Sequence, residues 1–130
     1  MKISILLPYK ENFSPIYAGA VSLFIKDTVK LSKYKKNITI YGNTHLKNIY
    51  NLRYKNIKLN KNIIQSGSKS YVKEFLKYEK FSSSDLIEIH NRPNYFHLIN
   101  KQKNNQKIVL YFHNDPLTMT GSRSIQERKI

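Results

Sequence analysis

Two short segments in the second half of the sequence follow the same pattern. Residues 85–93 read DLIEIHNRP and residues 108–116 read IVLYFHNDP. In each segment a largely apolar run ends at a His-Asn pair, and proline follows two residues after the asparagine. Such runs are typical of strands buried on both faces of a parallel sheet, and proline marks where each strand ends. The pattern predicts two parallel strands whose His-Asn pairs lie at one C-terminal edge, where open α/β sheets bind ligands.

The rest of the sequence alternates between strand-like and helix-like periodicity. The expected elements are, in chain order, a strand at 2–8, a helix at 19–34, a strand at 38–41, a short strand at 57–59, a helix at 69–80, a strand at 85–89, a helix at 93–100 and a strand at 108–112. This order predicts one domain over residues 1–130 with a Rossmann-like, doubly wound α/β fold and a mainly parallel sheet.

The last residues of the sequence carry a helix-start signal. Ser124 and Glu127 have the spacing of a capping box, but only about two helical turns could follow before Ile130. Because an isolated helix of that length is marginal, we expect the tail over residues 121–130 to be frayed. We therefore interpret the sequence as an incomplete N-terminal domain.

The composition is strongly basic, with 23 Lys and Arg residues, 8 Asp and Glu residues and a formal net charge of +15. This charge fits a polyanionic partner, but the joint abundance of Lys, Asn, Ile and Tyr also fits a simple compositional bias. The lysines are scattered, so we expect weak binding to anionic membranes or nucleic acid, without sequence preference. The sequence has no cysteine and no signal-peptide core, which indicates a cytoplasmic protein, with peripheral contact at the inner membrane face as an option.

Several catalytic motifs are absent from the sequence. It contains no G-x-G-x-x-G turn, no P-loop, no G-x-S-x-G elbow and no zinc-type histidine spacing. Neither a cofactor nor a metal is predicted. Readings as a nicotinamide-dependent enzyme, P-loop nucleotidase, hydrolase or metalloprotease are therefore poorly supported.

The candidate site consists of the two His-Asn turns and the start of the first helix. His90 and His113 either face a ligand or serve as turn residues bonded to nearby backbone, and the sequence leaves both options open. Gly19 opens a helix whose N-terminal N–H groups suit an anion, although a tight loop-to-helix junction explains it equally well. Arg92 and Arg123 each adjoin an expected helix start, where a guanidinium could grip phosphate or carboxylate. His45 and His97 lack such a setting and are interpreted as structural.

Taken together, these segments resemble the N-terminal domain of family-4-type glycosyltransferases of the GT-B fold. The resemblance rests on KISILLP at 2–8, AGAV at 18–21, LIEIHNRP at 86–93, VLYFHNDP at 109–116 and GSR at 121–123. It implies an enzyme of two domains that moves a sugar from a nucleotide-sugar to a glycan or lipid-linked acceptor. The second domain would supply most donor contacts, including an E-x7-E pair that this sequence lacks.

The resemblance also assigns roles to individual residues. His113 would be the catalytic residue. Gly19 and Ala20 would line the donor phosphates. The residues implied to contact the acceptor or the transferred sugar are His90, Asn91, Arg92, Asn114, Asp115 and Arg123. No metal would take part, since helix N-termini and cationic side chains would stabilise the leaving diphosphate.

Overall fold

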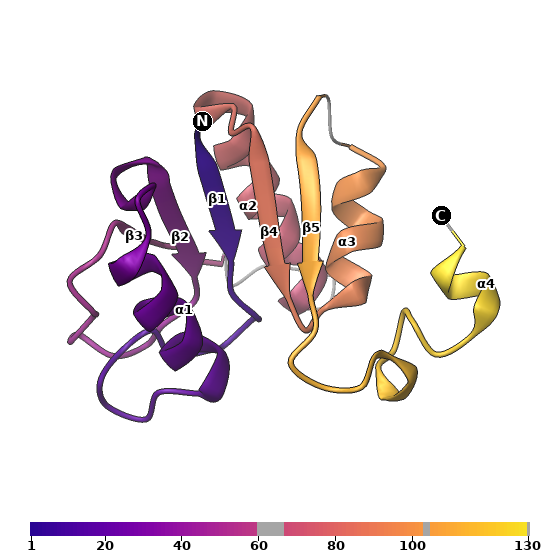
Figure 1. The fold of residues 1–130 in the computed structure, drawn as a ribbon, viewed down its shortest axis with the longest axis horizontal. Coiled ribbons are helices and arrows are strands. Elements are labelled where there is room, and N and C mark those ends of the chain that lie inside the picture. The colour runs from indigo at the N-terminus through magenta and orange to yellow at the C-terminus, as the bar shows by residue number, and fades with distance from the viewer. Residues whose placement is uncertain (60–66, 103–104, 130) are drawn as a thin grey trace.

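A five-stranded sheet organises the chain in the computed structural model, which describes residues 1–59, 67–102 and 105–129 (Figure 1). Its strands are β1 (Ile3–Leu6), β2 (Ile38–Gly42), β3 (Tyr54–Asn56), β4 (Leu86–His90) and β5 (Lys107–Tyr111). They lie in the order β3-β2-β1-β4-β5, and every neighbouring pair is parallel. The predicted parallel α/β sheet is therefore confirmed.

Helices cover both faces of the sheet, as the doubly wound fold requires. Helix α1 (Ala20–Leu31) lies on one face, while α2 (Gly67–Ser82) and α3 (Pro93–Asn100) lie on the other (Figure 1). Val21, Ile25 and Val29 form the buried stripe of α1, at the spacing of one helical face. They pack against β1 and β2 together with the fully buried ring of Phe13.

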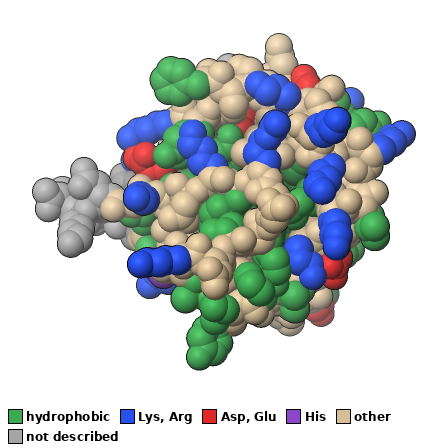
Figure 2. All heavy atoms as spheres, turned by 90° about the vertical axis from the view of Figure 1, so that its left-hand side faces the viewer, with side chains coloured by type: hydrophobic (Ala, Val, Ile, Leu, Met, Phe, Trp, Pro, Cys, Tyr) green, Lys and Arg blue, Asp and Glu red, His purple; other side chains and the backbone are tan. Residues whose placement is uncertain are grey.

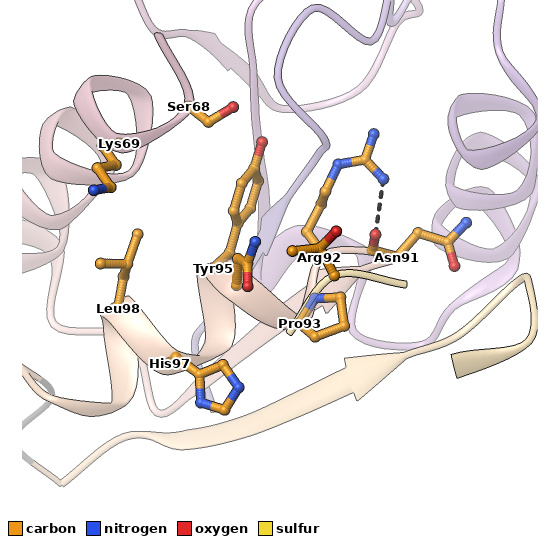
Figure 3. A pocket seen from close by; sticks show the side chains of 10 residues that line it. Ser68, Lys69, Asn91, Arg92, Pro93, Tyr95, His97 and Leu98 are labelled. Carbon is orange, nitrogen blue, oxygen red and sulfur yellow. Dashed lines mark hydrogen bonds between the residues drawn. The ribbon is translucent and has the colours of Figure 1, made fainter. Parts of the chain in front are cut away.

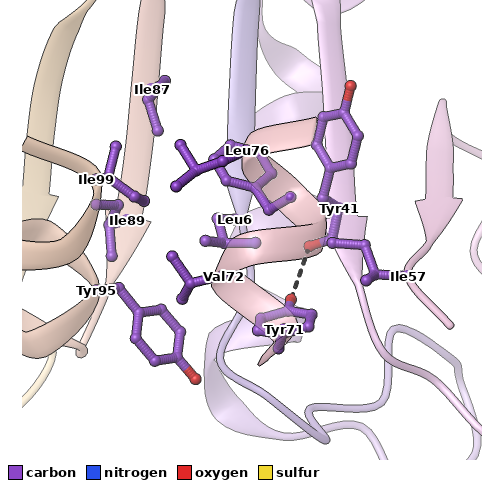
Figure 4. Close-up of a cluster of buried hydrophobic side chains, with 11 residues drawn as sticks. Leu6, Tyr41, Ile57, Tyr71, Val72, Leu76, Ile87, Ile89, Tyr95 and Ile99 are labelled. Atoms are coloured by element: carbon purple, nitrogen blue, oxygen red, sulfur yellow. Dashed lines mark hydrogen bonds between the residues drawn. The ribbon is translucent and has the colours of Figure 1, made fainter. Parts of the chain in front are cut away.

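A second core fills the space between the sheet and α2 and α3 (Figure 4). Tyr71 of α2 is fully buried there, and its hydroxyl donates a 2.7 Å hydrogen bond to the carbonyl oxygen of Leu7. The same hydroxyl lies 3.4 Å from the carbonyl oxygen of Tyr41. Burial holds the pKa of Tyr71 well above its usual value. One side chain thus ties the start of α2 to the ends of β1 and β2.

A buried carboxylate ties the other end of α2 to the sheet. Glu79 is buried and accepts hydrogen bonds from the hydroxyl groups of Ser4 on β1 and Ser84 before β4. The backbone N–H of Ser84 donates to the same carboxylate at 3.3 Å. Glu79 lies at the N-terminal edge of the strands, so it is remote from the edge that carries the His-Asn pairs.

Every expected element except the helix at 93–100 has a shifted boundary, as three of them illustrate. The third strand is Tyr54–Asn56 rather than 57–59, because these residues pair with β2, the ring of Tyr54 stacks on Phe13, and Ile57 after the strand is fully buried. The first strand ends at Leu6, although the N–H of Leu7 still bonds to β2. Helix α1 ends at Leu31 rather than Tyr34, since Ser32 adopts an extended backbone.

The expectation that the last strand is buried on both faces is wrong. Strand β5 is the edge of the sheet, and its side chains Val109 and Tyr111 are 43% and 42% exposed. Its other face, with Ile108 and Leu110, packs against the core of α2 and α3. This strand is therefore apolar on both faces, although only one face is covered by helices.

The C-terminal segment continues past the sheet and ends in the short helix α4 (Ile125–Arg128), which lies apart from the strands (Figure 1). The predicted capping box is confirmed: Ser124 Oγ accepts the Glu127 N–H at 3.1 Å, and the Glu127 carboxylate accepts the Ser124 N–H at 2.9 Å. Ile125 is 60% exposed. Fraying of this helix stays a prediction.

Among the described helices, none combines the length and the apolar character needed to cross a lipid bilayer.

Candidate functional site

The two His-Asn pairs meet at one edge of the sheet. His90 is the last residue of β4, and His113 follows the end of the neighbouring parallel strand β5. Nδ1 of His90 lies 2.8 Å from Nε2 of His113, so the two rings share a hydrogen bond. The prediction of parallel strands with both histidines at the same edge is confirmed.

Asn91 fastens the two turns together. Its backbone adopts a left-handed conformation with φ of 53°, which asparagine tolerates better than most residues. Its Oδ1 accepts the backbone N–H groups of His113 at 2.7 Å and Asn114 at 3.3 Å, and its Nδ2 donates to Oδ1 of Asn114 at 2.7 Å. The asparagines, rather than the histidines, therefore make the hydrogen bonds that hold the two turns.

Glu88 extends the histidine pair into a row of three side chains. It precedes His90 by two residues on β4 and therefore points to the same face of the sheet. Its Oε1 lies 2.5 Å from Nε2 of His90, whose side chain is completely buried. Sequence reasoning missed Glu88, although an acidic residue two positions before the histidine of an apolar strand is a usable signal.

Aromatic rings enclose the outer histidine. The ring of Phe24 on α1 contacts His113 edge-on at 4.9 Å between centroids, and the ring of Tyr111 lies 4.8 Å away. Burial lowers the pKa of His113, and the neighbouring His90 lowers that pKa further. The carboxylates of Glu11 and Glu88 act in the opposite direction. His113 is therefore a neutral imidazole at physiological pH, and it remains partly open to solvent.

The start of α1 already holds an anionic group of the chain. Oε1 of Glu11 accepts the backbone N–H of Ser22 at 3.1 Å, within the first turn of the helix. A side chain at Gly19 would overlap this carboxylate, so the flexible end of Glu11 would have to shift. Ala20 is the first helical residue and is exposed. The place that the resemblance assigns to donor phosphates is thus occupied by a carboxylate, since a helix N-terminus attracts any nearby anion.

The other candidate residues divide into two groups. Arg92 adjoins the His-Asn cluster, and its guanidinium donates to the carbonyl oxygen of Asn91 at 2.7 Å. Asp115 instead accepts the N–H of Leu117 at 2.9 Å and so begins a short 3-10 turn. Arg123 donates to the carbonyl oxygen of Thr118. Asp115 and Arg123 therefore stabilise the C-terminal segment and are not bonded to the histidine pair. His97, expected to be structural, bonds to the carbonyl oxygen of Gly121 at 2.9 Å.

A pocket of about 610 Å³ adjoins the cluster between the first turns of α2 and α3 (Figure 3). Ser68 and Lys69 of α2 lie on one side, and Asn91 and Arg92 lie on the other. No acidic residue is among the described residues that line it. Asn91 lines the pocket and belongs to the His-Asn cluster, so the two features are adjacent, although neither His90 nor His113 lines the pocket.

The sheet topology places this site where a ligand is expected. The chain runs from β1 outward to β3 and then returns to β4, so the strand order reverses between β1 and β4. Ligands of open α/β sheets bind at such a reversal, beyond the carboxyl ends of the strands. His90 ends β4, and Glu11 lies in the loop after β1. Nowhere in residues 1–59, 67–102 and 105–129 do three His, Cys, Asp or Glu side chains gather as a metal site would need.

Comparisons with protein-family models, curated proteins and solved structures find no match to this chain.

Proposed function

We propose that this chain is the acceptor-binding domain of an enzyme that transfers a sugar from a nucleotide-sugar, of the GT-B kind that its sequence resembles. The observation that carries the proposal is the hydrogen-bonded cluster of His90, Asn91, His113 and Asn114 at the strand-order reversal. The two turns are far apart in sequence, yet side chains of both meet at the edge where α/β sheets bind ligands.

The chemistry of the cluster suits a ligand rich in hydroxyl groups. A neutral imidazole and primary amides accept and donate hydrogen bonds without demanding a charged partner. The half-exposed ring of Tyr111 offers an apolar surface beside them. His113 would contact the reacting sugar, and the pocket beside Arg92 would hold the rest of the acceptor.

The donor diphosphate would be held mainly by a second domain. The carboxylate of Glu11 at the start of α1 repels a phosphate, unless a cation accompanies the donor. Transfer depends on groups that stabilise the leaving diphosphate from both sides of the reacting bond. We therefore expect no measurable sugar transfer by the 130-residue chain alone.

A second function is favoured by a different observation, the net charge of +15. In this alternative the chain is a non-enzymatic module that binds an anionic surface. Lysine and arginine side chains are dispersed over the face in Figure 2, with apolar and uncharged groups between them. Dispersed charges give weak binding that salt screens. If the chain is part of a sugar-transferring enzyme, the dispersed basic charge would give weak contact with an anionic membrane from the cytoplasmic side.

Calorimetric titration of the whole chain separates the two functions. We expect nucleotide-sugars or acceptor oligosaccharides to bind at physiological salt, and His113→Gln to weaken that binding about tenfold, the loss of one or two hydrogen bonds. His45→Gln is the matched control, since His45 is exposed and stands outside the cluster. Tight binding of nucleic acid at the same salt, without any sugar binding, would favour the basic module instead.

A further inference from the structure

We propose that Glu88 and His90 are positioning residues that fix the tautomer of His113, so that Nδ1 of its ring accepts a hydrogen bond from a hydroxyl group of the bound ligand. The identity of that ligand as a sugar rests on the proposed function, whereas the tautomer follows from the row of side chains itself. The inference deepens the proposed function because it defines the chemical group that His113 selects.

The proton arrangement follows from the two contacts in the row. An ionised Glu88 only accepts hydrogen bonds, so Nε2 of His90 must carry the proton that lies in the 2.5 Å contact. In the proposed row His90 carries this one proton only, so that its Nδ1 faces His113 without a hydrogen. Nε2 of His113 must therefore donate across the 2.8 Å contact, which leaves its own Nδ1 without a hydrogen. Within the described part of the chain, no residue donates a hydrogen bond to that nitrogen.

Burial keeps this row from rearranging. His90 is completely buried, so a ring nitrogen without a partner there would lose a hydrogen bond that solvent cannot replace. The ring of Tyr111 stacks on His90 at 5.4 Å, and Phe24 closes the side toward α1. The backbone N–H of His113 is held by Asn91 at 2.7 Å, which sets the position of the outer ring.

Burial preserves the neutral state of His113 near physiological pH, against the pull of the nearby carboxylates. From β4, Glu88 and His90 face it; from the loop after β1, Glu11 does; and from β5, the neutral Tyr111 lies against it. Burial disfavours a positive charge on His113 most, and repulsion opposes charging both imidazoles at once; these effects outweigh the two carboxylates, so the pKa of His113 is lowered. Acidification would place a hydrogen on Nδ1 and abolish the acceptor.

The consequence is a selection rule for the ligand. A bare Nδ1 requires a partner that donates a hydrogen, which a sugar hydroxyl does and a phosphate oxygen does not. His113 would therefore recognise the sugar part of a ligand and reject its phosphate. This division agrees with the carboxylate of Glu11 at the start of α1, which also disfavours phosphate at this edge.

Long-range ¹H–¹⁵N NMR of the histidine rings tests the arrangement at about pH 7.5, because protonated and bare ring nitrogens have separate shifts. In the wild-type chain we expect His90 and His113 to carry their protons on Nε2 alone. Glu88→Leu should release the row and raise the Nδ1-protonated form of His113. Glu88→Gln keeps an acceptor oxygen and should retain the wild-type tautomer. Glu74→Leu is the control, since Glu74 bonds to Lys77 on α2 and to no other residue that the structure describes.

Sugar binding provides the second readout. Glu88→Leu should weaken binding of an acceptor oligosaccharide about fivefold to tenfold, and Glu88→Gln should restore most of it. Protonation of Nδ1 in the wild-type chain, or an unchanged tautomer in a folded Glu88→Leu variant, would overturn the inference. If the tautomers behave as expected but neither sugars nor nucleotide-sugars bind, the ligand assignment and the proposed function fail, while the positioning roles of Glu88 and His90 stand.

Discussion

Replacing Tyr71 by phenylalanine should destabilise the fold by a predictable amount. The change removes one hydroxyl group and keeps the ring that fills the core between α2 and the sheet. The carbonyl oxygen of Leu7 then loses a 2.7 Å hydrogen bond inside the buried core. A buried polar group left without its partner costs about 1–3 kcal/mol, and the retained ring places Tyr71→Phe in the lower part, about 1–2 kcal/mol. At about 2.1 cal/mol/K of unfolding entropy per residue, Tm should fall by roughly 4–7 °C.

Thermal and urea unfolding followed by circular dichroism measure this change. Tyr17→Phe is the matched control, because Tyr17 is 86% exposed and its hydroxyl should contribute little. The control should stay within about 0.5 kcal/mol of the wild-type chain. If Tyr71→Phe is equally neutral, the hydroxyl does not hold α2 to the end of β1, and the description of this core is wrong.

Three further changes test other contacts. Glu79→Ala should lower the free energy of unfolding by about 2–4 kcal/mol in urea titrations, because it leaves two buried serine hydroxyls without a hydrogen-bond acceptor. Glu79→Gln should lower the free energy of unfolding by less. Gly19→Ala should move the Glu11 carboxylate off the Ser22 N–H and lower the free energy of unfolding by about 1 kcal/mol, the loss of one hydrogen bond, and the double variant with Glu11→Ala should be no less stable than Glu11→Ala alone. Because the pKa of His113 is lowered, the folded chain binds fewer protons than the unfolded chain. Stability should therefore fall as the pH drops from about 7 through the unfolded pKa of about 6.5 toward the lowered folded value, and His113→Gln should flatten that part of the pH profile.

The sequence predicted the sheet and its edge because those features depend on local signals. An apolar run followed by His-Asn-x-Pro specifies a strand and its end, and two copies specify the same edge of a parallel sheet. The position of strand β3 was not predicted, because Tyr54–Asn56 contains no apolar run and an edge strand needs little apolar content. The exposed face of β5 was not predicted either, because an apolar strand sequence does not show whether a helix covers each face.

The candidate site was predicted in part. His90 and His113 could be placed at one edge from sequence, because neighbouring parallel strands end at the same edge, although the register pairs His90 with Tyr111. Glu11 could not be placed at the start of α1, since a loop side chain leaves no periodic signal. Asp115 and Arg123 were assigned by resemblance, but they bond within the C-terminal segment, where their contacts depend on loop geometry.

The most direct test of the account is an NMR titration of the whole chain that follows the imidazole signals of all four histidines at physiological salt. A nucleotide-sugar and an acceptor oligosaccharide are added in turn. The account predicts saturable shifts for His113 and His90, with His45 unchanged. Saturable binding that leaves His113 and His90 unmoved would show that the ligand site lies elsewhere and would contradict the account.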